Sequence, residues 1–236
     1  RDEIKTKMIY VVSNIYGNYA KLQTLFRKIE FSENDLLYVL GDMVDYGEES
    51  METVCDLSVR SNVYPVCGDH DVMACRMLSG FDAMLKKGST PDESFIADMQ
   101  KWVSNGGQPT LDGFRALDQE MKEGVLDYLS DIPPYEIAET EDGRNFLLVH
   151  SGIRHFVPGQ DPEDYDPADF YEGTLDTEKM YFKKTGLIVG HTEIAFGQTS
   201  DSGLCRKGNL IALHSGAVPG PSLNCLCLDN GQEYSV

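Results

Sequence analysis

Residues 36–47 read LLYVLGDMVDYG, and this stretch decides the fold. It begins as an apolar run of the kind that forms a buried β-strand. A Gly-Asp turn follows, so the side chain of Asp42 is delivered to the carboxyl edge of a sheet and Asp45 lies on the loop behind it. Open α/β sheets place their functional sites at that edge. Asp is also a common turn former. Whether this turn belongs to a functional site therefore depends on the residues at the other strand ends.

The N-terminal part of the chain follows a β-α-β-α-β pattern. Three apolar runs predict strands, at 8–13, 36–40 and 63–66. Three segments read as helices, at 19–29, 49–60 and 73–85. This alternation predicts a right-handed, parallel, doubly wound sheet. Parallel strands end at the same edge, so we expect the polar loops that follow them to lie together.

A more polar segment separates this part from a second group of strands. We expect residues 88–131 to form an inserted helical cap, with helices at 91–102 and 114–129 and a break at 105–107. Four further apolar runs predict strands, at 146–149, 186–189, 210–213 and 223–228, the last as a hairpin at the edge of the sheet. The chain, 1–236, is thus predicted to be a single α/β domain that carries this cap.

The composition limits the partners and the compartment. The chain has 39 acidic and 20 basic residues and a formal net charge of −19. Such a surface repels nucleic acid and anionic membranes, so we expect neither as a partner. No apolar run is long enough to span a bilayer. The six cysteines show no CxxC or zinc-ribbon spacing, which predicts reduced thiols and a cytoplasmic protein.

Four separate strand ends carry side chains that commonly bind metals. These are Asp42, Asp69, His150 and His191. A single histidine in such a place is more often a packed side chain, but two carboxylates and two imidazoles on separate loops make a mixed ligand set. That set suits Mn, Fe or Zn better than Ca or Mg. The sequence therefore predicts a divalent metal centre.

The order of these motifs resembles the calcineurin-like metallophosphoesterases, in the branch of bacterial serine/threonine protein phosphatases and dinucleoside tetraphosphatases. The likeness runs nearly end to end, through SNIYGNYAKLQTL, LYVLGDMVDYG, GDHD, WVSNGGQPTL, LLVHSGI, LIVGHT and LIALHSGAV. It implies a layered α/β/β/α fold with a sandwich of mixed sheets and a small helical cap. It also implies phosphoester hydrolysis with two bound metal ions.

The resemblance implies a role for each metal-binding candidate. Asp42 corresponds to the carboxylate that bridges two ions. Asp69 takes the place of an Asn in the family and would hold the second ion together with His150 and His191. A carboxylate binds a hard cation at least as well as an amide, so the type of ligand is preserved at that position.

The resemblance also implies an acid–base pair. His70 matches the family's general acid, which protonates the leaving oxygen, and Asp45 matches the carboxylate that orients it. Asn105, on the predicted cap, is a candidate for contact with a substrate oxygen. A helix end made by the following Gly-Gly is the simpler interpretation of that position.

The chain departs from the family where the first metal and the phosphate are held. The first strand ends in Asn14-Ile15-Tyr16-Gly17 instead of Asp-x-His-Gly. The first ion would then have a neutral amide and a phenol, whose unperturbed pKa is about 10, as its private ligands. Tyr46 replaces an Arg that clamps phosphate and supplies one neutral donor at most. The acidic loop 161–176 lacks the second family Arg, and Arg154 is the nearest.

Two functions from different classes therefore remain open. The first is a metal-dependent phosphoester hydrolase, impaired or altered, that acts on a phosphorylated small molecule, a nucleotide or a phosphoprotein. The second is an inactive pseudophosphatase that acts as a binding module. The His70–Asp45 pair favours residual hydrolysis, whereas the lost cationic clamps favour binding. Two metal ions per chain would support catalysis, and one or none would support the binding function.

Overall fold

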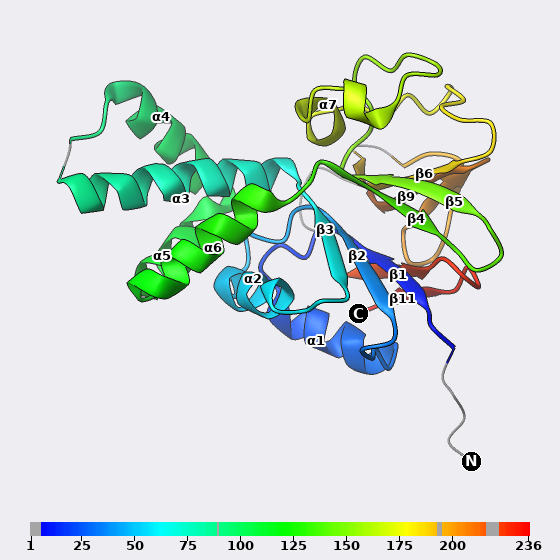
Figure 1. Ribbon diagram of the computed structural model, residues 1–236, viewed down its shortest axis with the longest axis horizontal. Helices are drawn as coiled ribbons and strands as arrows, with labels where there is room; N and C mark the ends of the chain where they lie inside the picture. Colours follow the sequence, from blue (N-terminus) through cyan, green and yellow to red (C-terminus); the bar gives the residue numbers. More distant parts are fainter. Residues whose placement is uncertain (1–5, 89, 193–194, 216–221) are drawn as a thin grey trace.

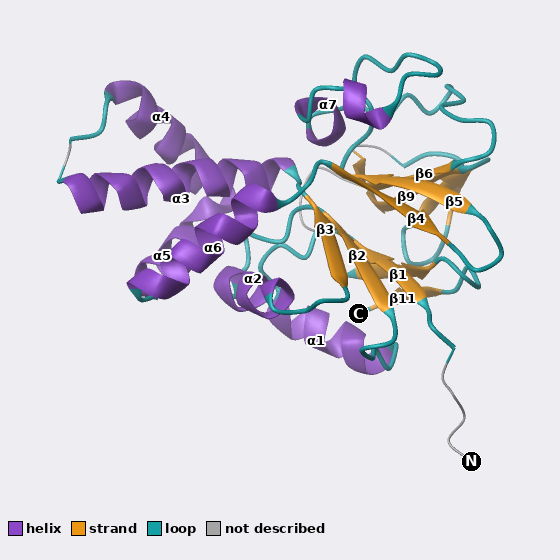
Figure 2. Ribbon diagram, in the orientation of Figure 1, coloured by secondary structure: helices purple, strands orange, loops and turns teal. Residues whose placement is uncertain are grey.

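The computed structural model describes residues 6–88, 90–192, 195–215 and 222–236. Two β-sheets are stacked face to face, and most of the helices lie outside the first sheet (Figure 1). Figure 2 shows the same layers, with the short helix α7 (Ala168–Tyr171) outside the second sheet. The predicted layered α/β fold with two mixed sheets is confirmed.

The first sheet has the strand order β11-β10-β1-β2-β3. Its strands are β1 (Ile9–Val12), β2 (Leu36–Leu40), β3 (Val63–Val66), β10 (Asn224–Cys227) and β11 (Glu233–Ser235). The strands β1, β2 and β3 are parallel, as predicted. The predicted hairpin at the edge of the sheet is present as β10 and β11, which pair antiparallel. The strand within 223–228 is not itself the outermost one, because β10 pairs with β1 on one side and with β11 on the other. Every residue of β10 is buried, which is typical of an interior strand.

The second sheet has the strand order β4-β5-β6-β9-β8-β7. Its strands are β4 (Tyr135–Glu139), β5 (Asn145–Val149), β6 (Gly186–Thr192), β7 (Gln198–Thr199), β8 (Cys205–Lys207) and β9 (Leu210–Ser215). The central strands β5, β6 and β9 are parallel and contain the runs predicted from the sequence. The short strands β7 and β8, and the mainly solvent-facing β4, were not predicted.

The helices α1 and α2 lie against the first sheet, and α3 to α6 extend to one side of it (Figure 1). Their bounds are α1 (Tyr19–Lys28), α2 (Ser50–Ser58), α3 (Asp69–Lys87), α4 (Glu93–Trp102), α5 (Gln108–Ala116) and α6 (Gln119–Asp131), with a π-helical turn η1 (Val103–Gly107) and a 3₁₀ turn η2 (Pro162–Asp164). The helices α4 to α6 fall within 88–131; that this segment is an insertion into a single domain stays a prediction. No helix in the described part of the chain is long and apolar enough to cross a bilayer.

Two helix predictions differ from the structure by more than two residues. The helix α3 begins at Asp69 instead of residue 73, because the Asp71 carboxylate accepts a hydrogen bond from the backbone nitrogen of Gly68 (3.0 Å) and closes the first turn. The predicted helix at 114–129 is two helices. Asp118 starts the second, and its side chain accepts a hydrogen bond from the backbone nitrogen of Met121 (2.9 Å).

Three apolar clusters hold the layers together. The largest fills the space between the first sheet and its helices, and a second lies between the two sheets, where Leu40, Leu148 and Ile188 are completely buried. The third covers the outer face of the second sheet, beneath Phe170 of α7. Burial of the central strands of both sheets fixes their register, so the loops that leave these strands are held in a defined relation to one another.

Candidate metal centre and acid–base pair

The loops after β1 and β2 adopt an unusual backbone conformation. Asn14, Tyr16, Asp42, Asp45 and Tyr46 all have positive φ angles, between 50° and 73°. A left-handed conformation costs a non-glycine residue roughly 1–2 kcal/mol, and such strain gathers at functional sites. Hydrogen bonds tie the two loops together, from the nitrogen of Asn14 to the carbonyl of Gly41 (3.0 Å) and from the nitrogen of Tyr16 to the carbonyl of Asp42 (2.9 Å).

Three of the four predicted metal ligands form one compact group. The Nε2 atom of His150 lies 3.5 Å from Oδ2 of Asp42 and 3.3 Å from Oδ1 of Asp69. One ligand atom from each of the three residues lies within 4.8 Å of the others. The ring of His150 is completely buried, yet its Nε2 has no hydrogen-bond partner. A divalent cation could be bound between this buried nitrogen and the two carboxylates.

A second hydrogen bond orients the imidazole of His150. Its Nδ1 lies 2.8 Å from the carbonyl oxygen of Leu40, so Nδ1 carries a proton and Nε2 faces the carboxylates, the usual arrangement in metal-binding histidines. Burial disfavours the charged ring, but the Asp42 and Asp69 carboxylates outweigh it and raise the pKa of His150 to about 9. In the metal-free chain, a proton on Nε2 therefore takes the place of a cation.

His191, the fourth predicted ligand, lies beside this group. Its ring stacks on that of His150, with 5.8 Å between the ring centroids and 7° between the planes. Burial and the positive charge of His150 lower the pKa of His191 to about 4. The buried Nδ1 of His191 has no hydrogen-bond partner. A neutral imidazole with a nitrogen that makes no hydrogen bond is able to act as a ligand.

The residues of the expected first metal site do not fit a cation. Nδ2 of Asn14 donates hydrogen bonds to Oη of Tyr16 (2.8 Å) and Oδ2 of Asp42 (3.1 Å). Because the Asp42 carboxylate accepts, the amide turns its hydrogens toward this space. Burial and the nearby Asp42 carboxylate raise the pKa of Tyr16 well above its usual value, so the phenol stays protonated. A cation needs acceptor atoms here, and the amide presents hydrogens.

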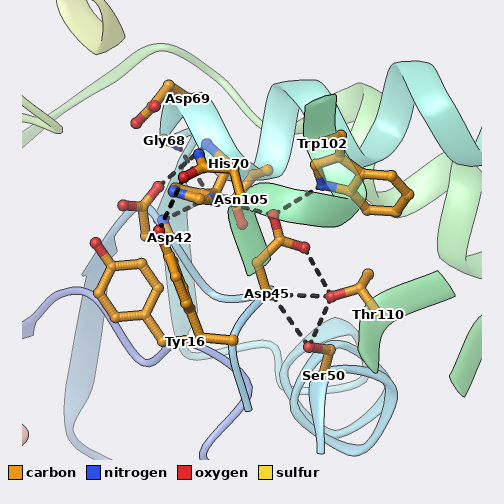
Figure 3. Close-up of polar contacts among 12 residues, drawn as sticks. Tyr16, Asp42, Asp45, Ser50, Gly68, Asp69, His70, Trp102, Asn105 and Thr110 are labelled. Carbon is orange, nitrogen blue, oxygen red and sulfur yellow. Dashed lines mark hydrogen bonds and ion pairs between the residues drawn. The ribbon is translucent and has the colours of Figure 1, made fainter. Parts of the chain in front are cut away.

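His70 and Asp45 form a buried pair next to the candidate metal ligands (Figure 3). Nδ1 of His70 lies 2.7 Å from Oδ2 of Asp45, and the backbone nitrogen of His70 donates to Oδ1 of Asp42 (3.3 Å). Burial disfavours the charged imidazole, but the hydrogen bond with Asp45 and the Asp42 charge raise the pKa of His70 to about 9. The ring is therefore protonated at neutral pH.

Two residues that the sequence analysis did not single out hold Asp45. Nε1 of Trp102 donates to Oδ2 of Asp45 (2.8 Å), and Oγ1 of Thr110 donates to Oδ1 (2.7 Å) (Figure 3). Both belong to WVSNGGQPTL, the motif on which part of the resemblance depends. A buried carboxylate needs donors, and these two lie more than fifty residues further along the chain.

A buried carboxylate, Asp71, fixes the loop that carries Asp42. It accepts hydrogen bonds from the backbone nitrogens of Asp42 (2.7 Å), Met43 (2.9 Å) and Gly68 (3.0 Å). The loop after β2 is thereby tied to the start of α3. The GDHD motif contained this residue, but its spacing alone does not show which backbone groups it binds.

The two candidates for substrate contact lie together at the edge of the site. The hydroxyl of Tyr46 is 3.5 Å from Oδ1 of Asn105, and the backbone nitrogen of Tyr46 donates to the carbonyl of Gly106 (2.8 Å). Gly106 has φ +98°, and a Cβ there would meet the Tyr46 ring at 2.8 Å. The close approach keeps Tyr46 beside Asn105, and neither residue supplies the positive charge of the Arg expected at position 46.

A cavity of about 420 Å³ opens beside the metal-ligand group. It is lined by Asp69, His150 and His191 on one side and by residues 171–175, at the end of the acidic loop, on the other. Arg154 is not among the lining residues; its guanidinium binds Asp169 (3.1 Å) and Glu172 (3.0 Å). The described lining of this cavity therefore contains no cationic clamp of Arg or Lys.

Comparison with known proteins places the chain in a family. The model of the calcineurin-like phosphoesterase family matches residues 7–213. The chain therefore belongs to the calcineurin-like phosphoesterases, a family of metal-dependent hydrolases of phosphoesters.

Its similarity to named relatives extends over nearly the whole chain. It is 29% identical to the symmetrical bis(5'-nucleosyl)-tetraphosphatase of Pseudomonas fluorescens, over 96% of the chain and 93% of the relative. It is 30% identical to the enzyme of that name from Neisseria gonorrhoeae, over 96% and 94%.

Solved structures share the fold. The metallophosphoesterase from Sphaerobacter thermophilus superposes with a TM-score of 0.57 at 17% identity, covering 98% of this chain and 87% of that one. A protein provisionally assigned as a diadenosine tetraphosphatase gives a TM-score of 0.61 at 21% identity, covering 99% and 94%.

Proposed function

We propose that this phosphoesterase works with one divalent ion instead of two. The observation that carries the proposal is the contrast between the two halves of the site. On one side, Nε2 of His150 lies between the carboxylates of Asp42 and Asp69. On the other side, Asn14 and Tyr16 are joined by a hydrogen bond, and Asn14 also donates to Asp42. The first arrangement attracts a cation and the second excludes one.

Asp42, Asp69 and His150 would hold the ion, with His191 as a further ligand. This mixed set of carboxylates and imidazoles suits Mn, Fe or Zn. When bound, the ion supplies a Lewis acid that neutralises charge on a phosphoryl oxygen. Its binding would replace the proton that Nε2 of His150 holds between the Asp42 and Asp69 carboxylates in the metal-free chain.

The residues of the chain perform the proton transfer. Burial disfavours the charged His70 ring, but the hydrogen bond with Asp45 and the Asp42 charge raise its pKa to about 9 in the metal-free chain. The Asp45 hydrogen bond does not involve a proposed metal ligand and would favour the protonated ring with the ion bound as well. Water attacks phosphorus and forms a new P–O bond as the bond to the leaving oxygen breaks. His70 would donate its proton to that leaving oxygen and recover one from water, and Asp45 keeps the ring in the orientation this requires. Proton donation of this kind typically contributes about 10²–10⁴-fold to the rate.

We expect turnover to be slower than in a two-metal site with cationic clamps. A second ion and bidentate Arg side chains each stabilise charge that develops in the transition state. Their loss costs several kcal/mol, and about 1.4 kcal/mol corresponds to a tenfold change in rate. The cavity beside Asp69 offers no such cation among its described lining residues.

The proposed substrate is a phosphorylated small molecule, with dinucleoside polyphosphates as the first class to test. The support is the similarity to two symmetrical bis(5'-nucleosyl)-tetraphosphatases over nearly the whole chain. The missing Arg clamps also make a phosphoprotein a less suitable substrate.

The direct experiment measures hydrolysis of p-nitrophenyl phosphate and of diadenosine tetraphosphate, with and without added Mn²⁺. We expect turnover that requires the metal and is lost in His150→Ala. The matched control is His155→Ala, which removes a surface histidine whose side chain is 76% exposed. Absence of hydrolysis with Mn²⁺, Fe²⁺ or Zn²⁺ would refute the proposal.

The second candidate function is that of a pseudophosphatase, and one observation favours it. The hydrogen bonds from Asn14 to Tyr16 and Asp42 satisfy these side chains without any metal. A protein of this class would bind diadenosine tetraphosphate and release it unchanged. Calorimetric binding without hydrolysis in the same samples would establish it in place of the first proposal.

A further inference from the structure

We propose that Trp102 and Thr110 are positioning residues, which hold Asp45 and, through it, the ring of His70 in the geometry for proton donation. The inference rests on the proposed hydrolase function. We refer to Asp45, His70, Trp102 and Thr110 as the positioning network. The network connects α4 and α5 to the proposed acid–base pair.

Every oxygen of the Asp45 carboxylate has a defined partner. Oδ2 lies 2.7 Å from Nδ1 of His70 and 2.8 Å from Nε1 of Trp102. Oδ1 accepts from Oγ1 of Thr110 at 2.7 Å. The plane of the carboxylate is thus determined by donors on both oxygens, and the position of Oδ2 determines where Nδ1 of His70 must lie.

Because these residues are buried, their hydrogen bonds allow few other positions of the Asp45 carboxylate. Asp45 and Thr110 are 0% exposed, Trp102 is 3% exposed and His70 is 9% exposed. An indole N–H can only donate. The hydrogen bond of Trp102 therefore forms only when the Asp45 carboxylate presents an oxygen to it. A buried polar group that loses its partner is costly, and water has little access to replace one.

The network spans three helices. His70 lies in α3, Trp102 is the last residue of α4 and Thr110 lies in α5. Outside the network, Oγ of Ser50, at the start of α2, lies 3.0 Å from Oγ1 of Thr110. Gly107 lets the indole rest on the backbone, because a Cβ there would meet Trp102 at 2.3 Å. Figure 3 shows the indole and the Thr110 hydroxyl converging on Asp45. Helix packing therefore sets the position of His70.

The test compares leaving groups. Protonation matters when the leaving oxygen is basic and matters little when it is not. We expect Trp102→Phe and Thr110→Val to lower kcat for phenyl phosphate about 10- to 100-fold, and for 2,4-dinitrophenyl phosphate less than about threefold, with unchanged KM. The matched control is Thr53→Val, which removes the hydroxyl of another buried threonine whose hydrogen bond goes to the carbonyl of Glu49.

The possible outcomes separate this inference from the proposed function. Equal losses on both substrates would show that the two residues are merely structural, and wild-type rates on both would show that they are unnecessary; either result overturns the inference. A wild-type protein that hydrolyses neither substrate refutes the proposed function.

A spectroscopic measurement tests the network without any turnover. We expect the side-chain N–H resonance of His70, observed by NMR in ¹⁵N-histidine-labelled protein and assigned with His70→Gln, to shift in Trp102→Phe and in Thr110→Val. The Thr53→Val control leaves it in place. Unchanged His70 resonances in the two network variants would overturn the inference even if the protein proves inactive.

Discussion

Nδ2 of Asn14 donates a hydrogen bond of 3.1 Å to Oδ2 of Asp42, the same oxygen that lies 3.5 Å from Nε2 of His150. One carboxylate oxygen therefore faces an amide hydrogen and an imidazole nitrogen. A cation can replace the proton on the imidazole, but it cannot bind the amide through its hydrogens. We therefore expect a cation on the His150 side of the site and none on the Asn14 side.

Restoring the family ligands should restore the second ion. In the double variant Asn14→Asp, Tyr16→His, we expect two metal ions per chain and a turnover at least about 100-fold above that of the parent, because two ions stabilise both oxygens of the displacement. Metal analysis and hydrolysis of p-nitrophenyl phosphate check this. Tyr46→Arg serves as the control and should leave the metal content unchanged. A double variant with one ion and parental turnover would contradict the assignment of these positions.

Metal binding should release a proton from His150. Its pKa in the metal-free chain is raised to about 9, so the ring is charged at pH 7 and must lose the Nε2 proton to bind a metal. The apparent affinity should therefore rise about tenfold per pH unit as the pH approaches 9. Calorimetry in buffers of different ionisation enthalpy should count about one proton released per Mn²⁺ at pH 7. Binding without proton release would contradict the charge state derived for His150.

The raised pKa of His150 also makes the stability of the fold depend on pH. A histidine whose folded pKa lies above the unfolded value of about 6.5 stabilises the fold fully below that pH. The contribution is lost as the pH rises through about 9. In His150→Gln, we therefore expect the metal-free protein to lose stability relative to the parent at pH 6 and to differ less from it at pH 9.5, as measured by urea unfolding. A difference in stability between variant and parent that grows with pH would contradict the raised pKa of His150.

Two glycines in the segment after α3 should respond oppositely to alanine. A Cβ at Gly107 would meet the Trp102 ring at 2.3 Å, whereas at Gly124, inside α6, it would meet nothing within 4 Å. Gly124→Ala should stabilise the protein by roughly 0.5–1 kcal/mol, the helix preference of Ala over Gly. Gly107→Ala should destabilise it and shift the emission of Trp102, the only tryptophan of the chain. Equal effects in urea unfolding would contradict the packing described.

The sequence identified the strand ends because each carries a local signal. An apolar run followed by Gly-Asp, His-Ser-Gly or Gly-His marks where a buried strand stops and which side chain comes next. Asp42, Asp69 and His150 do lie together, with His191 beside them. Their roles as ligands and the roles of His70 and Asp45 in catalysis stay predictions, as do manganese as the metal and the cytoplasm as the location.

What the sequence did not reveal depends on contacts between distant residues. The partners of Asp45 are Trp102 and Thr110, and no periodicity or spacing links them to it. The start of α3 was missed for a related reason. A cluster of Gly, Asp and His has the composition of a loop. The hydrogen bond from the backbone nitrogen of Gly68 to the Asp71 carboxylate makes it the first turn of a helix. The outermost strand of the edge hairpin, β11, was missed because it is short and polar.

The most direct test of the one-metal centre is to count ions. The purified chain is stripped with chelator, equilibrated with excess Mn²⁺, freed of unbound metal, and analysed by inductively coupled plasma mass spectrometry against protein concentration. We predict one Mn²⁺ per chain, lost in His150→Ala. Two ions per chain in the unmodified protein would contradict the claim that Asn14 and Tyr16 exclude the second cation.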